Sequence, residues 1–518
     1  MDHLGSIALS FIAVALLSIF YEKVFGARSV GHSASLPFPP GPPSLPIIGN
    51  FLQLHTNYSW LTYADWGRQY GPIVYACTFG QHIIVVNSLK VATELFEKRS
   101  RVYSSRPDVP MLKLMGWDFN MAWLPYGDKW RRYRRMSQQH FHRDASQTHR
   151  STQLKKIHDM LRGLLSSPEN FRQHIRTVAG AIIMSTVYGY DVKPINDRFV
   201  TLAEKAVDKL SESVFPGATA VNTFPFLRHL PGWLPGCGFQ RFAADCRQLI
   251  SEMQQAPLDY VQQNMREDKD SQSITAKILA ASEARGHTDL KMIREVTALI
   301  YAAGADTTPS ALATFFLTMA LSPEVQKKAQ NEIDAVVGTH RLPDFEDRPK
   351  LTYVEALYRE VLRWRPVAPL SVTRETSADD VYEGYFIPKG ATVIVNTWAM
   401  SRDESIYQEP ERFMPERYFT ADGKLNDDQV TIVFGFGRRI CVGRYSADNT
   451  LWATIVSILS TFDIAKAKNA EGNEIDIDPS AYSDGHISHP APFECSITPR
   501  SEAVRNLIQS TAEDVFEL

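Results

Sequence analysis

The spacing of apolar residues predicts a body built mainly from helices. Between about residues 125 and 365 the apolar positions recur with helical periodicity. Pro216-Gly217 and the stretch from Pro231 to Gly238 interrupt this periodicity, and we expect helix ends there. A further helix is expected over 444–458.

Short sheets are predicted around this helical body. Strand-like runs such as 83–86 (Ile-Ile-Val-Val) lie between about residues 50 and 110, mixed with helical stretches. Between 367 and 400, β-like segments alternate with turn signals such as Glu383-Gly384. The last 50 residues are predicted to be strand and turn. The expected fold class is therefore mainly α with small β-sheets.

An uncharged apolar run from Leu4 to Tyr21 predicts a single transmembrane anchor over residues 1–21. As a helix its 18 residues measure about 27 Å, close to the hydrocarbon core of a bilayer. The alternative is a cleaved signal peptide, but Asp2 precedes the run and the basic Lys23 and Arg28 follow it. By the positive-inside rule the rest of the chain stays in the cytosol.

A proline-rich segment, 37–43 (PFPPGPP), follows the anchor. Proline-rich stretches are stiff and extended, so residues 22–49 are predicted to be a linker with a hinge. The remaining residues, 50–518, are predicted to form one catalytic domain on the cytosolic side of the membrane.

Composition narrows the class of protein. The 518 residues are 44% hydrophobic and 22% charged, with a formal net charge of −3. These are globular values, and such a balanced charge argues against a nucleic-acid binder. Five scattered cysteines suit neither a disulfide framework nor a zinc site.

The segment 434–443 (FGFGRRICVG) carries the clearest chemistry. Its glycines permit a tight loop, and Arg438 and Arg439 are expected to favour the thiolate of Cys441. The helix predicted after it places this sulfur near a helix N-terminus, which also stabilises an anion. A thiolate in such a loop is typical of a proximal haem ligand, the alternative being an inert buried thiol.

This loop resembles the haem-binding loop of the cytochrome P450 family, FxxGxRxCxG, and matches it at every fixed position. The resemblance extends over about residues 36–500 and implies the cytochrome P450 fold. It also implies haem b (iron protoporphyrin IX), with Cys441 as the axial ligand of the iron. The loop residues that the resemblance assigns to the cofactor are Phe434, Gly437, Arg439, Cys441 and Gly443.

Residues 303–308 (AGADTT) resemble the oxygen-activating segment of that family. The resemblance makes Asp306 and Thr307 the catalytic pair that relays protons to bound oxygen. The alternative is a packed helix with a capping pair. Pro309 departs from the expected pattern and should bend this helix or widen its groove.

Three further motifs fit the same family. Glu360 and Arg363 match ExxR, and Arg417 lies in PERY, which resembles PERF; together they imply a buried structural charge network. Trp130 and Arg134 match WxxxR and, with Arg374 and Arg439, are implied to bind the haem propionates. The same stretch contains a basic group that is either a solvated face or a docking face for an electron donor, namely Lys129, Arg131, Arg132 and Arg135.

The family implies a monooxygenase that hydroxylates, epoxidises or desaturates a lipophilic small molecule. Because the chain has no GxGxxG loop, electrons are expected from NADPH through cytochrome P450 reductase, with cytochrome b5 as a second donor. The stretches WLTYADWGRQYG and LPGWLPGCGFQR resemble fungal enzymes of secondary metabolism. The implied location is the endoplasmic reticulum membrane.

Two other functions remain open, a haem-thiolate isomerase or dehydratase that needs no reductase and a non-catalytic haem protein. Substrate identity is not encoded in any motif. Aromatic residues in loops expected to contact the substrate are Trp117, Phe119, Trp123 and Phe215. The apolar stretch 224–235 is either a membrane-dipping connection or core.

Overall fold

The computed structural model describes residues 36–54, 57–194, 196–214, 219–234, 236–267, 269 and 272–512. The predicted anchor (1–21), the predicted break at 216–217 and Phe215 lie outside these residues. Among the residues described, none of the helices has both the length and the apolar character needed to cross a bilayer.

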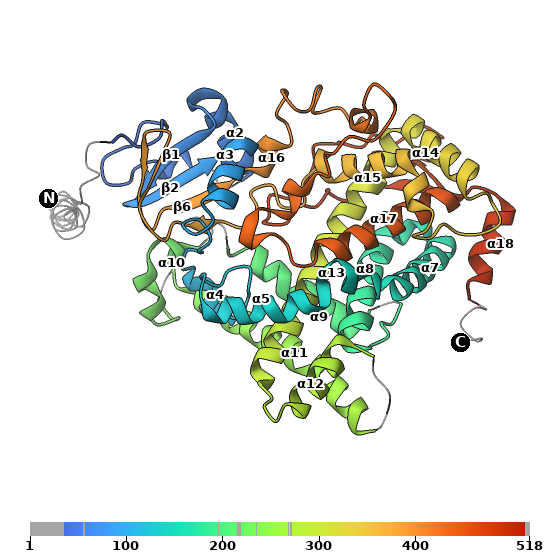
Figure 1. The fold of residues 1–518 in the computed structure, drawn as a ribbon, viewed down its shortest axis with the longest axis horizontal. Coiled ribbons are helices and arrows are strands. Elements are labelled where there is room, and N and C mark those ends of the chain that lie inside the picture. The colour runs from blue at the N-terminus through green and yellow to red at the C-terminus, as the bar shows by residue number, and fades with distance from the viewer. Residues whose placement is uncertain are drawn as a thin grey trace.

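The small sheets predicted from the sequence are present. The main sheet lies at one end of the molecule, opposite the end where α18 lies (Figure 1). Its strand order is β1-β2-β6-β3, with β2 and β6 parallel and the other pairs antiparallel. Glu383 and Gly384, both with positive φ, form the turn of the β4–β5 hairpin. The strands are β1 (Ile73–Thr78), β2 (Gln81–Val86), β3 (Arg374–Glu375), β4 (Asp380–Tyr382), β5 (Tyr385–Ile387), β6 (Thr392–Val395), β7 (Phe462–Lys466) and β8 (Cys495–Pro499).

Helices make up most of the described chain, as predicted. The longest, α13, runs through the middle of the molecule with α8 and α17 beside it (Figure 1). The helices are α2 (Ser59–Tyr70), α3 (Leu89–Thr93), α4 (Pro110–Met115), α5 (Asp128–Phe141), α6 (Arg143–Gln147), α7 (Arg150–Ser166), α8 (Phe171–Tyr188), α9 (Arg198–Ser211), α10 (Ala220–Thr223), α11 (Gly238–Arg266), α12 (Ile274–Ala284), α13 (Leu290–Leu321), α14 (Pro323–Val336), α15 (Thr352–Trp364), α16 (Thr397–Met400), α17 (Arg444–Thr461) and α18 (Glu502–Ser510).

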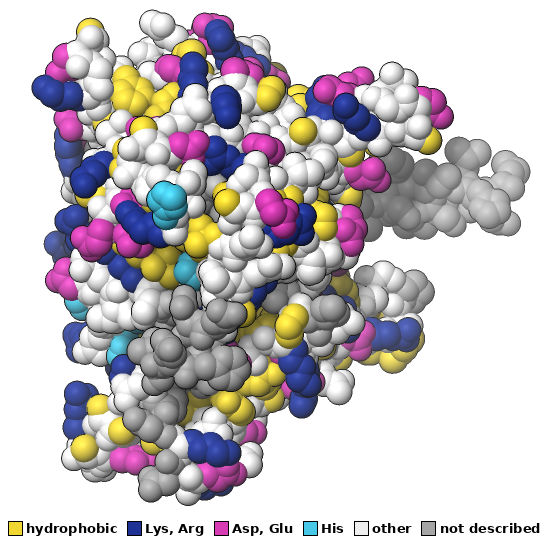
Figure 2. Space-filling model, turned by 90° about the vertical axis from the view of Figure 1, so that its right-hand side faces the viewer, with side chains coloured by type: hydrophobic (Ala, Val, Ile, Leu, Met, Phe, Trp, Pro, Cys, Tyr) yellow, Lys and Arg dark blue, Asp and Glu magenta, His cyan; other side chains and the backbone are white. Residues whose placement is uncertain are grey.

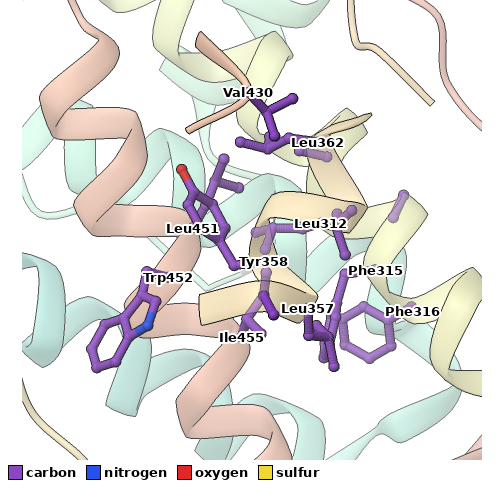
Figure 3. Packing of buried hydrophobic residues seen from close by; sticks show 14 of the residues in the cluster. Leu312, Phe315, Phe316, Leu357, Tyr358, Leu362, Val430, Leu451, Trp452 and Ile455 are labelled. Atoms are coloured by element: carbon purple, nitrogen blue, oxygen red, sulfur yellow. The ribbon is translucent and has the colours of Figure 1, made fainter. Parts of the chain in front are cut away.

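The centre of the core is the junction of α13, α15 and α17 (Figure 3). Phe315, Leu357 and Ile455, one from each of these helices, are fully buried. Because these helices are buried on more than one face, they pack against neighbours on several sides. This packing fixes α13 relative to the segment that precedes α17, which carries Cys441.

The C-terminal region contains a helix where the sequence predicted only strands and turns. The prediction for the last 50 residues is wrong at α18. The Ser501 side chain accepts a hydrogen bond from Val504 N–H and caps this helix. The buried Val504 and Ile508, four residues apart, are the helical signal. Pro309 removes one backbone donor, yet α13 continues through it as a single helix.

The charged surface is mixed in sign. On the face in Figure 2, Lys and Arg side chains alternate with Asp and Glu side chains, with apolar side chains between them. This arrangement agrees with the small net charge of −3.

Candidate active site

A cavity of about 370 Å³ lies between α13 and the Cys441 loop. Ala303, Asp306 and Thr307 line it from α13, and Cys441 lines it from the loop before α17. This volume lies in the range of small-molecule sites, about 300–1,000 Å³. The structure therefore brings together the two segments that the sequence singled out, although 134 residues separate Thr307 from Cys441.

The loop before α17 depends on its glycines. Gly437 has φ +53°, and a Cβ placed on it would lie 2.1 Å from the backbone oxygen of Phe96. Gly435, with φ +83°, makes the preceding bend. The loop closes through a hydrogen bond from Cys441 N–H to Phe434 O (2.8 Å), and α17 begins three residues after the cysteine. The sulfur is thereby held at the cavity wall.

The electrostatics at Cys441 differ from expectation. Burial raises the pKa of its thiol, and the Gly443 N–H, Arg134 and Arg444 oppose that rise. Arg438 and Arg439 were predicted to stabilise the thiolate, which is wrong, because Arg438 donates to the Tyr126 hydroxyl and Arg439 to backbone carbonyls. The cations that act on the sulfur come from α5 and α17 instead.

Four arginines line the cavity, namely Arg106, Arg134, Arg374 and Arg439. None of these four arginines takes part in an ion pair found among the described residues. Burial lowers the pKa of all four guanidinium groups, to about 10 for Arg374 and about 9 for Arg439. Their donors reach only carbonyl oxygens: Arg106 those of Ala122, Val372 and Thr373, Arg134 that of Ile440, Arg374 those of Tyr103 and Phe436, and Arg439 those of Ser104, Met121 and Leu124.

Buried guanidinium groups without acidic partners are costly, so the cavity favours an anionic ligand. A flat group with two carboxylates, such as haem, fits this donor set. Trp130 also lines the cavity, with the Arg439 guanidinium 4.4 Å from its ring centroid. Sequence analysis missed Arg106, which lies in no recognised motif. The only signal of Arg106 in the sequence is that a basic residue lies between two segments with buried apolar residues.

The α13 wall contains the predicted acid and alcohol. The Thr307 hydroxyl donates to Ala303 O (3.0 Å), one helical turn earlier. Asp306 Oδ1 lies 3.1 Å from Nε2 of His489, a residue that sequence analysis did not single out. Gly304 faces α8, since a Cβ there would meet Ile183 at 3.0 Å, so it serves helix packing and does not enlarge the cavity.

The charge network predicted around Glu360 is present and lies outside the cavity lining. Glu360 and Arg363 have fully buried side chains joined by hydrogen bonds of 2.7 and 2.8 Å. Arg417 Nε donates to Glu360 at 3.1 Å, and Met414 N–H donates to it at 2.9 Å. The network ties α15 to the segment that contains the PERY sequence.

The cavity wall beyond the arginines is mostly apolar. Trp117 and Trp123 line it as expected, together with Leu299 and Val372. Phe119 does not line it and instead stacks on Trp117, with ring centroids 5.5 Å apart. The site thus presents an apolar compartment next to the acid and alcohol of α13.

Comparison with known proteins agrees with this geometry. The sequence model described as Cytochrome P450 matches residues 39–494. Cytochrome P450 monooxygenase ple1 of Rhodocybe pseudopiperita is 41% identical over 479 residues, 91% of each chain. Cytochrome P450 monooxygenase 208 of Postia placenta is 41% identical over 507 residues, 97% of this chain and 96% of its own.

A haem-thiolate oxidoreductase is the class of protein that this fold and site define. The chain belongs to the cytochrome P450 family, and its relatives are fungal monooxygenases. It is a cytochrome P450 monooxygenase.

Proposed function

We propose that this enzyme inserts one oxygen atom of O2 into a lipophilic small molecule by hydroxylation, epoxidation or desaturation chemistry. The observation that carries the proposal is the single cavity that has Cys441 on one wall and Asp306 with Thr307 on another. The apolar lining around Trp117 and Trp123 suits a substrate with few polar groups.

Haem b is the cofactor that we propose for the site. Cys441 would hold its iron, and Arg106, Arg134, Arg374 and Arg439 would pair with its propionates, with Trp130 beside them. When bound, a thiolate-ligated haem supplies the activation of O2, since the thiolate favours cleavage of the O–O bond. Phe434, Gly437 and Gly443 shape the loop that presents the sulfur.

The protein's own part in the chemistry is proton supply and exclusion of water. Asp306 and Thr307 both line the cavity, and their carboxyl and hydroxyl groups can exchange protons with a bound ligand. Thr307 passes a proton on by rotating its hydroxyl away from Ala303 O. The apolar walls keep bulk water from the substrate side of the cavity.

Electrons are proposed to come from NADPH through cytochrome P450 reductase, with cytochrome b5 as a second donor. The exposed Arg131, Arg132 and Arg135 on α5 offer a basic face for an acidic partner. Within this group, Arg131 pairs with Asp128, and Lys129 lies 3.6 Å from Glu295. Arg132 lies 3.8 Å from Asp289, so Arg135, which has no ion pair among the described residues, is the strongest candidate for docking.

We also propose that the enzyme is anchored in the endoplasmic reticulum membrane with its catalytic domain in the cytosol. Exposed apolar side chains support a membrane-facing surface, among them Leu52 (68% exposed), Phe226 (64%) and Trp233 (79%). Phe79 contacts both Phe51 and Phe224, which joins the N-terminal segment to the 224–234 region. Fractionation of cells expressing the full chain, with and without residues 1–21, tests this placement.

The relatives are fungal cytochrome P450 monooxygenases, and we propose for this enzyme a role in fungal secondary metabolism. The test is reconstitution of the full chain with reductase, NADPH and a panel of lipophilic substrates such as terpenoids and polyketides. We expect product only when both NADPH and reductase are present. Turnover without reductant or peroxide would instead establish the isomerase or dehydratase alternative.

Thr307→Ala tests the proton assignment separately. It should leave the haem-thiolate spectrum intact and divert electrons from product into hydrogen peroxide. Unchanged product per NADPH would contradict the assignment. Thr318→Ala is a matched control, because Thr318 is a buried residue of the same helix. Its hydroxyl likewise donates a hydrogen bond to a backbone carbonyl of the preceding turn, Phe315 O.

A further inference from the structure

The Asp306 carboxylate has a partner from a distant part of the chain. His489 Nε2 lies 3.1 Å from Asp306 Oδ1, and the two side chains are 28% and 21% exposed. Asp306 lines the cavity, whereas His489 is not among its lining residues. The pair therefore joins a residue of the cavity wall, Asp306, to a residue outside the cavity lining, His489.

The segment that carries His489 is firmly held. His489 N–H donates to the Ser483 hydroxyl (2.9 Å), and Ser483 N–H donates to His489 O (2.8 Å). The Ser310 hydroxyl of α13 donates to Ser488 O (2.6 Å). Since the loop is tied to the helix that carries Asp306, the imidazole and the carboxylate stay in register.

Two more carboxylates lie on α9 toward the surface. Glu204 and Asp208 are four residues apart and share one face of that helix. Burial and then the charge of Asp306 raise the pKa of Asp208. Burial also raises the pKa of Glu204, with smaller contributions from Asp208 and Asp306. α9 packs against α13, and Val207 and Leu210, on either side of Asp208 in sequence, line the same cavity as Asp306.

Their exposure increases away from the cavity. Asp208 is exposed and Glu204 is half-buried, with Arg176 of α8 at 3.9 Å. A series of titratable groups therefore leads from solvent to the one carboxyl that lines the cavity. We propose that His489 is a positioning residue that holds Asp306 ready for proton transfer, and that Asp208 resupplies its proton from solvent.

The proposal rests on the monooxygenase function above. Each hydroxylation takes one O2, two electrons and two protons, breaks one C–H bond, forms one C–O bond and releases one water. When the Asp306 carboxyl gives up a proton toward Thr307, Asp208 or solvent returns one to Asp306, which His489 holds in place. The electrons come from NADPH, so the route carries protons alone.

Other charged groups face this route and must be distinguished from His489. Arg176 and His489 lower the pKa of Asp208, and Glu212 raises it. His486, in the same loop, lines the cavity, but burial and Arg106 lower its pKa to about 4. His486 is therefore neutral at physiological pH, which leaves His489 as the histidine that pairs with Asp306.

His489→Gln is the first test, because it keeps a side-chain donor and removes the imidazole that contacts Asp306. Product formed per NADPH should fall roughly tenfold, the lower end of the effect of removing a partner that orients a functional group. The reducing equivalents that no longer form product should appear as hydrogen peroxide. His340→Gln, an exposed histidine far along the chain, is the matched control.

Two readouts separate positioning from a structural role. The reduced carbon monoxide spectrum should be unchanged in His489→Gln. In a thermal-unfolding cycle of His489→Gln, Asp306→Asn and the double variant, the shifts in melting temperature should be non-additive, which reports the pair without any turnover. Asp208→Asn, at an exposed position, should raise the solvent deuterium isotope effect on product formation without changing the melting temperature.

Coupling in His489→Gln equal to wild type at every pH would overturn the inference while leaving the monooxygenase function intact. An additive thermal cycle would also overturn it, because the pair would then not exist in solution. Failure of the wild type to form product with NADPH and reductase would overturn the proposed function first. If His489→Gln fails to fold, an unchanged isotope effect in Asp208→Asn overturns the route.

Discussion

Removing the charge of Glu360 should destabilise the fold strongly. In Glu360→Gln the buried Arg363 and Arg417 side chains lose their shared anion. The amide that replaces the carboxylate keeps one acceptor oxygen and adds an NH2 group where Arg363 now donates. Both guanidinium groups remain buried, so the desolvation cost stays while the attraction is lost.

The expected magnitude follows from general values. Breaking a buried charge pair costs about 3–5 kcal/mol. With about 2.1 cal/mol/K of unfolding entropy per residue, a body of roughly 480 residues has an unfolding entropy near 1 kcal/mol/K. Glu360→Gln should therefore lower the melting temperature by about 3–5 K.

Thermal unfolding followed by circular dichroism measures this shift. Glu416→Gln is the matched control, because Glu416 is 41% exposed and pairs with Lys328 at the surface. Such pairs contribute about 0–1 kcal/mol, so the control should melt within about 1 K of the wild type. Equal melting temperatures for Glu360→Gln and Glu416→Gln would refute the argument from buried charge.

Three further outcomes are expected. Gly437→Ala should abolish cofactor retention, because the added Cβ would lie 2.1 Å from Phe96 O; a normal haem content in the purified variant would contradict this. Arg106→Gln should speed haem transfer to apomyoglobin roughly tenfold, and a wild-type rate would show that it does not hold the propionates. Burial lowers the pKa of His149 from 6.5 to about 4. Between pH 6.5 and 4 the folded state therefore binds fewer protons than the unfolded state, and the free energy of unfolding falls as the pH drops through this range. His149→Gln should remove up to about 1.4 kcal/mol per pH unit of that fall, and melting curves between pH 7 and 5 that parallel the wild type would contradict it.

The sequence predicted the helical class and the small sheets. Local patterns were sufficient for these features, since helical periodicity and turn residues act over a few positions. The pairing of distant motifs was predicted by the family resemblance. The helix α18 was missed because its signal, a Ser501 cap with Val504 and Ile508, is short and lies among strand and turn residues.

Interactions between distant segments that lie outside the family motifs, or that the motifs do not specify, could not be predicted. Arg438 and Arg439 adjoin Cys441 in sequence, yet their side chains point to Tyr126 and to the carbonyl of Ser104. The pairing of His489 with Asp306 joins residues 183 positions apart and follows no motif spacing. Such contacts depend on tertiary packing, which places side chains regardless of their separation along the chain.

The carbon monoxide difference spectrum of the reduced full-length protein tests the central claim most directly. We expect a strongly red-shifted Soret band in the wild type and its loss in Cys441→Ala, while Cys495→Ala, at a half-buried thiol outside the cavity lining, keeps the band. A Soret band at the position of histidine-ligated haem, or a red-shifted band that survives in Cys441→Ala, would contradict the assignment of Cys441 as the haem ligand.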